Sequence, residues 1–368
     1  MEDSDGAVQL ALLPEPFTMH RGGVLERVQV AYETWGTLNA ERDNAVLLFT
    51  GLSPGAHAGS SDADPTPGWW DYMLGPGKPI DTNRWFVVCV NSLGSCFGST
   101  GPGSVDPRTG KPYNLEFPEL AVEDIAKAGR ETVRLLGVKR LRAVVGPSLG
   151  GMTALAYSVL YGDELDHLIT ISAACRAHPF AIAMRSLQRE VIRADPAWKG
   201  GDYPADAEPT EGMRLARKVG LMSYRSAEEW RHRFGRERIA NEYLSGGAFA
   251  PEFQVESYLE HNARNFSGRF DANSYLYLSR AMDWFDLADY GGSVEAALSR
   301  VGARRTLVIG VESDVLFPVD QQREIAEGLR QAGRVVEFAS LPSVQGHDAF
   351  LIDEERFAPL VRDFLSKA

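Results

Sequence analysis

The strongest constraint on the fold is one short segment, which reads Leu141-Arg-Ala-Val-Val-Gly-Pro-Ser-Leu-Gly-Gly-Met152. An apolar β-branched run leads into Gly146-Pro-Ser-Leu-Gly150, which matches G-x-S-x-G, and a helical pattern follows. A serine in so tight a strand-to-helix turn needs glycines beside it, and its Oγ projects above the sheet. The segment therefore predicts that Ser148 is a nucleophile. A glycine-rich phosphate-binding turn is the alternative, but it would normally have a lysine nearby, and none follows.

Short apolar runs recur on both sides of this turn, at residues 45–52, 85–91, 143–146, 168–172, 306–310 and 335–341. Continuous apolar runs of this length are typical of strands buried on both faces, as in a parallel sheet covered by helices. Helical patterns at 122–136 and 151–161 lie between some of these runs. The alternation indicates an α/β fold with a mainly parallel, doubly wound sheet.

The alternation stops between residues 178 and 299, which are poor in β-branched runs and rich in Arg, Glu, Ala, Met, Tyr and Trp. We expect a helical lid here, inserted into a core domain made of residues 1–177 and 300–368. The alternative is an independent helical domain. No Pro/Ser-rich linker marks either border of the segment.

A nucleophilic serine needs a base and an orienting carboxylate, which follow it in chain order as Asp or Glu and then His. The run at 306–310 leads into Val311-Glu-Ser-Asp314, and the last run is followed by Gly346-His-Asp348. We expect Asp314 and His347 to complete a triad with Ser148. Glu312 is the alternative acid. This pattern is typical of the α/β-hydrolase fold.

Two backbone N–H groups are expected to stabilise an oxyanion at this site. Leu149 follows the nucleophile at the start of a helix, and Leu52 lies in the loop after the first strong strand. A plain connecting loop is the alternative for the segment around Leu52.

Composition excludes several other classes of function. A net charge of −12 disfavours nucleic-acid and membrane-surface binding, and no apolar run approaches the ~18 residues of a membrane span. The histidines and cysteines have no zinc-site spacing. Cys89, Cys96 and Cys175 form no C-x-x-C pair, and the acidic start has no signal-peptide pattern, so we expect reduced thiols and a cytoplasmic protein.

Over nearly its whole length the chain resembles the homoserine O-acetyltransferase family of α/β-hydrolase-fold acyltransferases. The segments that carry the likeness, besides the serine turn, are residues 30–39, 76–86, 91–94, 98–102, 117–124, 195–203, 224–226 and 346–350. The resemblance implies a ping-pong reaction with acyl-CoA as co-substrate, no bound cofactor and a homodimer formed through the lids. It also implies that Arg217 binds an amino acid's carboxylate and that Asp348 holds its ammonium group.

Some residues depart from the usual family pattern. Pro54-Gly55 replaces Gly-Asp in the loop Leu52-Ser-Pro-Gly55, and Arg185 replaces a common Asn. An arginine facing the acyl pocket could pair with a succinyl carboxylate. These features resemble the serine O-succinyltransferase branch, which serves cysteine biosynthesis, so we expect Arg185 to select the donor and Leu52, Ser53, Pro54 and Gly55 to select the acceptor.

Several alternatives remain open at this point. Acylation of homoserine with acetyl-CoA or succinyl-CoA would use the same machinery. A simple hydrolase would release the acyl group to water, and a non-catalytic binding module could keep the fold alone. Arg185 could also be a surface or salt-bridged lid residue.

Overall fold

The structure is a computed structural model that describes residues 7–204, 206–240 and 247–367. In these residues an eight-stranded sheet has the order β1-β4-β8-β5-β9-β10-β11-β12. In that order the strands are Gln9–Leu12, Gln29–Trp35, Phe86–Val90, Ala45–Phe49, Leu141–Pro147, Leu165–Ile171, Arg305–Val311 and Val335–Leu341. From β8 to β12 every neighbouring pair is parallel, which confirms the predicted mainly parallel sheet.

The two strands that the apolar runs did not predict, β1 and β4, form the antiparallel edge of the sheet. On β1 the exposed Leu10 and Leu12 alternate with the buried Ala11. In β4, which is mostly buried, Glu33 and Thr34 interrupt the apolar residues, so neither strand has the long apolar run by which the others were found.

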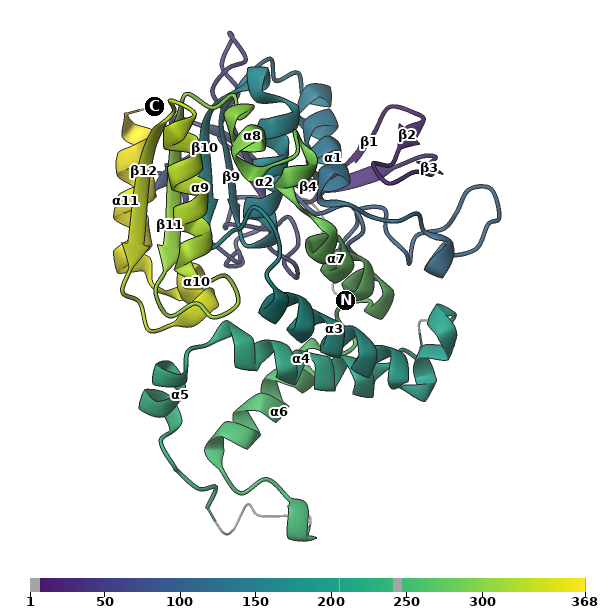
Figure 1. The fold of residues 1–368 in the computed structure, drawn as a ribbon. Coiled ribbons are helices and arrows are strands. Elements are labelled where there is room, and N and C mark those ends of the chain that lie inside the picture. The colour runs from purple at the N-terminus through teal and green to yellow at the C-terminus, as the bar shows by residue number, and fades with distance from the viewer. Residues whose placement is uncertain (1–6, 205, 241–246, 368) are drawn as a thin grey trace.

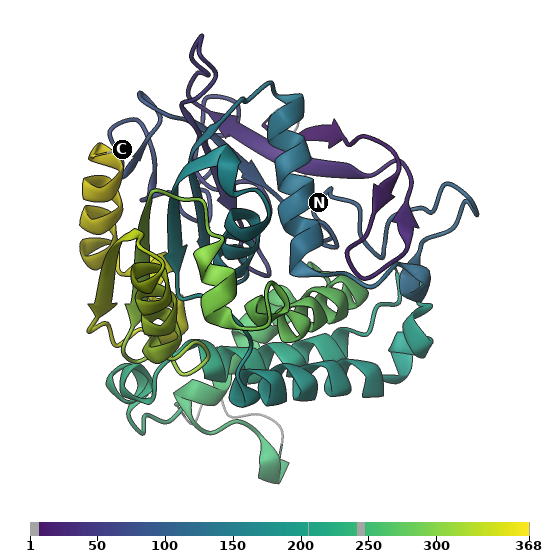
Figure 2. The same ribbon diagram turned by 45° about the horizontal axis from the view of Figure 1, so that its top comes forward.

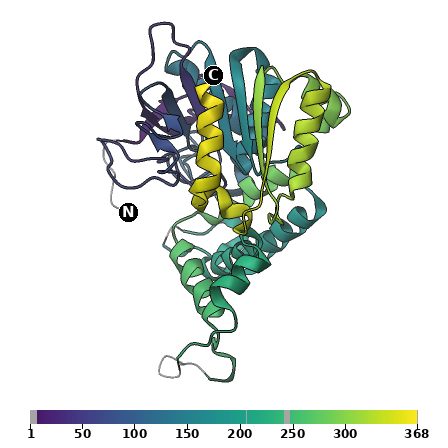
Figure 3. The same cartoon turned by 90° about the vertical axis from the view of Figure 1, so that its left-hand side faces the viewer.

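Helices cover both faces of the sheet (Figures 1 and 3). Helices α1 (Val122–Leu135), α2 (Leu149–Leu160) and α9 (Val319–Gln331) lie on one face, and α11 (Glu354–Ser366) lies on the other. The period of two along β9 decides which side chains meet which helix: Val144 packs in the cluster that contains α2, whereas Val145 packs with α11. The five parallel strands from β8 to β11 are thus buried on both faces, as expected, whereas β12 at the other edge of the sheet is mostly half-buried.

The remaining elements are short and lie between the longer strands and helices of the core and of the lid. They are β2 (Phe17–Thr18), β3 (Val24–Leu25), β6 (Leu74–Gly75), β7 (Ile80–Asp81), α10 (Ala349–Ile352) and the 3₁₀ helices η1 (Asn114–Glu116), η2 (Gly162–Glu164), η3 (Pro196–Gly201), η5 (Gly247–Phe249), η6 (Leu287–Asp289) and η7 (Gly346–Asp348).

Helices fill the interval between β10 and β11, where the lid was expected. They are α3 (Pro179–Ala194), α4 (Thr210–Tyr224), α5 (Ala227–Phe234), α6 (Gln254–Phe266), α7 (Ala272–Trp284) and α8 (Val294–Ser299). Most of them gather across one end of the sheet (Figure 2). The last helix, α8, packs instead on α9 of the core. Among the described residues no helix has the length and apolar character needed to span a bilayer.

Local sequence explains where the lid helices begin. Pro179 occupies the first turn of α3, where its missing N–H costs nothing. Ser226 caps α5 by accepting a hydrogen bond from the Glu229 N–H, and Asp271 caps α7 by accepting one from Ser274. Of these helices, α3 and α7 carry lid side chains of the pocket described below.

Candidate active site

Ser148 lies in a strained turn between β9 and α2. Its backbone has φ 56° and ψ −123°, a conformation that costs a non-glycine residue of the order of 1–3 kcal/mol. A Cβ at Gly146 would collide with the Gly150 carbonyl, and one at Gly150 would collide with the Phe49 carbonyl. The glycines that the sequence pattern singled out therefore permit two close backbone approaches.

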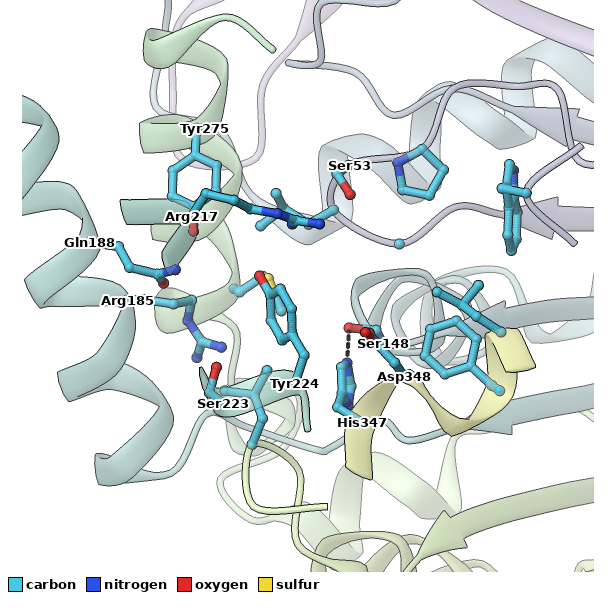
Figure 4. A pocket seen from close by; sticks show the side chains of 18 residues that line it. Ser53, Ser148, Arg185, Gln188, Arg217, Ser223, Tyr224, Tyr275, His347 and Asp348 are labelled. Atoms are coloured by element: carbon cyan, nitrogen blue, oxygen red, sulfur yellow. Dashed lines mark hydrogen bonds between the residues drawn. The ribbon is translucent and has the colours of Figure 1, made fainter. Parts of the chain in front are cut away.

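The structure brings Ser148, His347 and Asp314 into one hydrogen-bonded series. Nε2 of His347 lies 2.8 Å from Oγ of Ser148, and Nδ1 lies 2.7 Å from Oδ2 of Asp314 (Figure 4). The other oxygen of Asp314 accepts the N–H groups of Leu316 and Phe317 at 2.9 and 2.8 Å. These bonds hold the carboxylate still, and a fixed carboxylate fixes the ring orientation of the histidine.

The alternative acid, Glu312, does not reach His347. Its Oε1 instead accepts a hydrogen bond from the Ser340 hydroxyl, at 3.1 Å. The structure therefore places Asp314, and not Glu312, beside the histidine.

Burial and charge act in opposite directions on His347. Its side chain is buried, which by itself lowers the pKa of the imidazole. The charge and the hydrogen bond of Asp314 outweigh burial, so the pKa of His347 is raised above its ordinary value. The neighbouring Asp348 also has a raised pKa, because burial disfavours its carboxylate.

A cavity of about 140 Å³ opens above Ser148 (Figure 4). Gly51, Leu52, Ser53 and Pro54 form part of its wall, together with side chains of α3, α4 and α7. Leu52, the second expected oxyanion donor, thus lies in the pocket beside the turn that carries Leu149. The contact between Gly150 and the end of β5 explains this, because it brings the loop after β5 to the serine.

Gly55, the last residue of the expected acceptor loop, lies outside the pocket wall. A Cβ at this position would be in ordinary contact with Phe97, 3.5 Å away. The loop is anchored farther along by His57, whose Nδ1 lies 3.0 Å from Oε2 of the buried Glu33. Sequence reasoning assigned no role to His57 or Glu33. The one sequence signal for His57 is that its loop corresponds to a loop of the family that the chain resembles.

Arg217 projects from α4 into the same pocket. Its guanidinium carbon lies 4.5 Å from the centre of the Phe266 ring and 5.5 Å from that of Tyr224. Stacking on these rings keeps the guanidinium at the wall of the pocket.

Asp348, the expected ammonium ligand, already has a cationic neighbour. Oδ2 of Asp348 lies 3.2 Å from Nε of Arg225, in a largely buried ion pair. Arg225 is a site residue that sequence reasoning missed, although it stands inside the family-like segment at 224–226. Charge on an arginine does not by itself indicate which acid it will contact.

Arg185 both lines the pocket and forms a salt bridge within the lid. The residue is 4% exposed, and its Nε donates a hydrogen bond to Oδ1 of Asp283 at 2.6 Å. The expectation that Arg185 could be a surface residue is therefore wrong. The residue lines the pocket and also forms the salt bridge with Asp283. Other pocket residues that the sequence did not single out are Gln188, Ser223, Tyr224, Tyr275 and Met282.

The described residues hold no cluster of three or more His, Cys, Asp or Glu side chains that could bind a metal ion. The three cysteines are free thiols away from the pocket wall. Burial raises the pKa of Cys96 to about 12, so this thiol stays protonated at neutral pH.

Comparison with known proteins places this geometry in a family. The sequence pattern of the alpha/beta hydrolase fold family matches residues 44–350. A serine O-succinyltransferase of Litchfieldella anticariensis is 60% identical over 355 residues, which cover 96% of this chain and 97% of the relative. A serine O-succinyltransferase of Stenotrophomonas maltophilia is 57% identical, with 96% of each chain covered.

Solved structures show the same fold over the full length. A homoserine O-acetyltransferase from Bacillus anthracis superposes with a TM-score of 0.89 at 31% identity, covering 98% of both chains. Esterase E22 superposes with a TM-score of 0.86 at 27% identity, covering 97% of this chain and 100% of its own. The resemblance expected from the sequence is confirmed: the chain belongs to the α/β-hydrolase fold family and, within it, to the family of the serine O-succinyltransferases that it matches.

Proposed function

We propose that this chain transfers a succinyl group from succinyl-CoA to the hydroxyl of L-serine through an acyl-Ser148 intermediate. One observation carries the proposal: the pocket that contains the bonded Ser148 and His347 also contains the buried guanidinium of Arg185. The names of the relatives at 54–60% identity agree with it. The product would serve cysteine biosynthesis.

In the first half-reaction Ser148 attacks the thioester carbonyl carbon. His347 Nε2 takes the Oγ proton, and Asp314 stabilises the imidazolium that results. The backbone N–H groups of Leu149 and Leu52 are the proposed donors to the oxyanion. When the intermediate collapses, the carbon–sulfur bond breaks, the imidazolium proton goes to the leaving thiolate, and CoA departs as a free thiol.

In the second half-reaction the serine substrate takes the place of CoA. His347 accepts the proton of its hydroxyl, and the hydroxyl oxygen attacks the ester carbonyl. The bond to Ser148 Oγ then breaks, and the imidazolium returns its proton to Oγ. The product is O-succinylserine, and the enzyme regains its starting state without a bound cofactor.

Charged groups in the pocket suit both substrates. Arg185 would bind the free carboxylate of the succinyl group, and a hydrogen bond to a charged group contributes about 1.5–3 kcal/mol. Arg217 would bind the carboxylate of the acceptor amino acid. Asp348 would bind its ammonium group while it remains paired with Arg225.

Acceptor choice would depend on the loop that covers Ser148. Leu52, Ser53 and Pro54 reach the pocket wall, and Gly55 would act only through the course of the loop. Serine and homoserine differ by one methylene, which is worth about 1–3 kcal/mol of discrimination. We therefore expect measurable activity on homoserine as well.

A hydrolase is the second candidate, because esterase E22 shares the fold along its whole length. The two functions differ in whether water or an amino acid takes the acyl group from Ser148. CoA release separates them when succinyl-CoA and acetyl-CoA are each tested with L-serine, with L-homoserine and with no acceptor. The largest kcat/KM at succinyl-CoA and L-serine supports the proposal. A maximum at another pair, or equal release without acceptor, contradicts it.

The proposal includes a cytoplasmic homodimer joined through the lids. Exposed apolar side chains on α3 and α4 support this assembly: Phe180, Ile182, Leu187, Leu215 and Met222 are 36–60% exposed. Phe180 and Leu187 lie seven residues apart on α3, as Leu215 and Met222 do on α4, so each pair lies on one side of its helix. Exposed apolar side chains that gather in this way are typical of interaction surfaces.

A further inference from the structure

Three buried charged side chains join α3 to α7 behind the pocket. Arg185 and Arg189 lie one turn apart on α3, and Asp283 lies near the end of α7. Arg185 Nε donates to Oδ1 of Asp283 at 2.6 Å, and Arg189 Nη2 donates to Oδ2 at 2.5 Å. A single carboxylate is thus shared by two guanidinium groups, and the residues that carry them, Arg185 and Arg189, are 4% and 9% exposed.

The charges of this cluster do not balance. Two guanidinium groups and one carboxylate leave one buried positive charge. Throughout the part of the chain that the structure describes, Nη1 and Nη2 of Arg185 have no hydrogen-bond partner. Buried cations and donors are otherwise almost always paired, because desolvation is not offset without a partner. The cluster therefore needs an anion.

The unpartnered side of Arg185 belongs to the pocket. Asp283 occupies the Nε side of the guanidinium, which leaves the Nη1–Nη2 edge, a fork that can bind a carboxylate bidentately. The side chain extends from α3 into the pocket that contains Ser148 (Figure 4). Arg189 faces a separate groove, and its Nη1 donates to Ser279 Oγ at 3.3 Å.

We propose that Asp283 and Arg189 are positioning residues that hold Arg185 with its Nη edge toward the pocket and set the preference for an acyl donor with a free carboxylate. The inference rests on the proposed function and deepens it. Asp283 tethers Arg185 and separates it from the like charge of Arg189. Arg189 shares the carboxylate, so that Asp283 does not fully neutralise Arg185.

Two substitutions separate these roles. Asp283→Asn removes the charge that separates the arginines, so Arg185 is expected to leave its position. Arg189→Met leaves a neutral Arg185–Asp283 pair, which attracts an anion less strongly. In Asp283→Asn, Arg185 and Arg189 would both be buried without a carboxylate, which could prevent folding. In that case Arg189→Met alone tests the proposal. Asp320→Asn is the matched control, because Asp320 pairs with Arg323 on α9 and its side chain is 80% exposed.

The first experiment measures binding without turnover. A fluorophosphonate labels Ser148 in the presence of succinamate, which has a carboxylate and a neutral amide carbonyl, or of butyramide, which lacks the carboxylate. We expect the half-protecting concentration of succinamate to rise about tenfold in both variants, the scale of one charged hydrogen bond, relative to that of butyramide. No protection of the wild type by succinamate, or equal protection in wild type and variants, would overturn the proposal.

The second experiment compares succinyl-CoA with butyryl-CoA, which has the same chain length and no carboxylate. The ratio of their kcat/KM values should fall about tenfold in both variants and stay at the wild-type value in Asp320→Asn. Equal losses for both donors, together with a lower Tm, would mean that the cluster only packs the lid. If the wild type prefers another acceptor, the proposed function is wrong. The succinamate experiment still tests the roles of Asp283 and Arg189, because it involves no acceptor.

Discussion

Nε2 of His347 lies 2.8 Å from Oγ of Ser148, although 199 residues separate them along the chain. The histidine follows the last strand of the sheet, and the serine follows β9 near its centre. The carboxyl ends of parallel strands lie at the same edge, so their loops meet there. Asp314, after β11, reaches the same edge and completes the series.

The raised pKa of His347 gives a pH dependence with a definite sign. Only neutral His347 can accept the Oγ proton, so kcat/KM should fall as pH decreases through the raised pKa, above about 6.5. Asp314→Asn removes the cause of the increase and leaves the lowering effect of burial. Its acid limb should therefore move to lower pH, with kcat lower by about 10⁴. A pH–rate profile with the same midpoint in both proteins would contradict this assignment.

The strained backbone of Ser148 predicts a difference in stability between two inactive variants. Ser148→Ala keeps a side chain at φ 56°, whereas Ser148→Gly relieves the strain. Because glycine also gains more entropy on unfolding, we expect a net advantage of roughly 1 kcal/mol for Ser148→Gly. Urea unfolding of both variants measures it. Neither should form the fluorophosphonate adduct, and a more stable Ser148→Ala would show that the turn is unstrained.

Arg185→Asn should change donor preference. The variant loses the guanidinium that Asp283 holds at the pocket wall. We therefore expect kcat/KM for succinyl-CoA to fall by about one to two orders of magnitude. Acetyl-CoA has no carboxylate to lose, and its kcat/KM should fall much less. Steady-state CoA release with L-serine gives both values. Similar losses for the two donors would exclude Arg185 from donor selection.

The exposed apolar side chains of the lid predict where a dimer would be disrupted. Phe180 and Met222 are 52% and 60% exposed, on α3 and α4. Replacing both with Asp should give a monomer by size-exclusion chromatography with light scattering, because charge in an apolar interface is costly. Leu135→Asp on α1, at a position 51% exposed, is the control and should leave the mass unchanged. A wild-type monomer would rule out the dimer.

Much of the core could be predicted because its signals are local. The continuous apolar runs located the six parallel strands to within a few residues, and the glycines around Ser148 gave the turn from steric requirements alone. The edge strand β1 has only the short apolar run Leu10-Ala-Leu-Leu13, which did not identify it as a strand. Helix α8 lies in the interval expected for the lid but packs on α9, because its apolar side chains do not specify which helix covers them.

The sequence by itself determined the strand–turn–helix unit around Ser148 and the order of Asp314 and His347 after it, since adjacent residues impose these features. Only the tertiary structure decided that Arg225 pairs with Asp348 and that Asp283 lies between Arg185 and Arg189. Arg185 and Asp283 are 98 residues apart, and their contact depends on how α3 packs against α7. A charged side chain has many possible partners of opposite sign, and only the packing of the helices that carry them selects one.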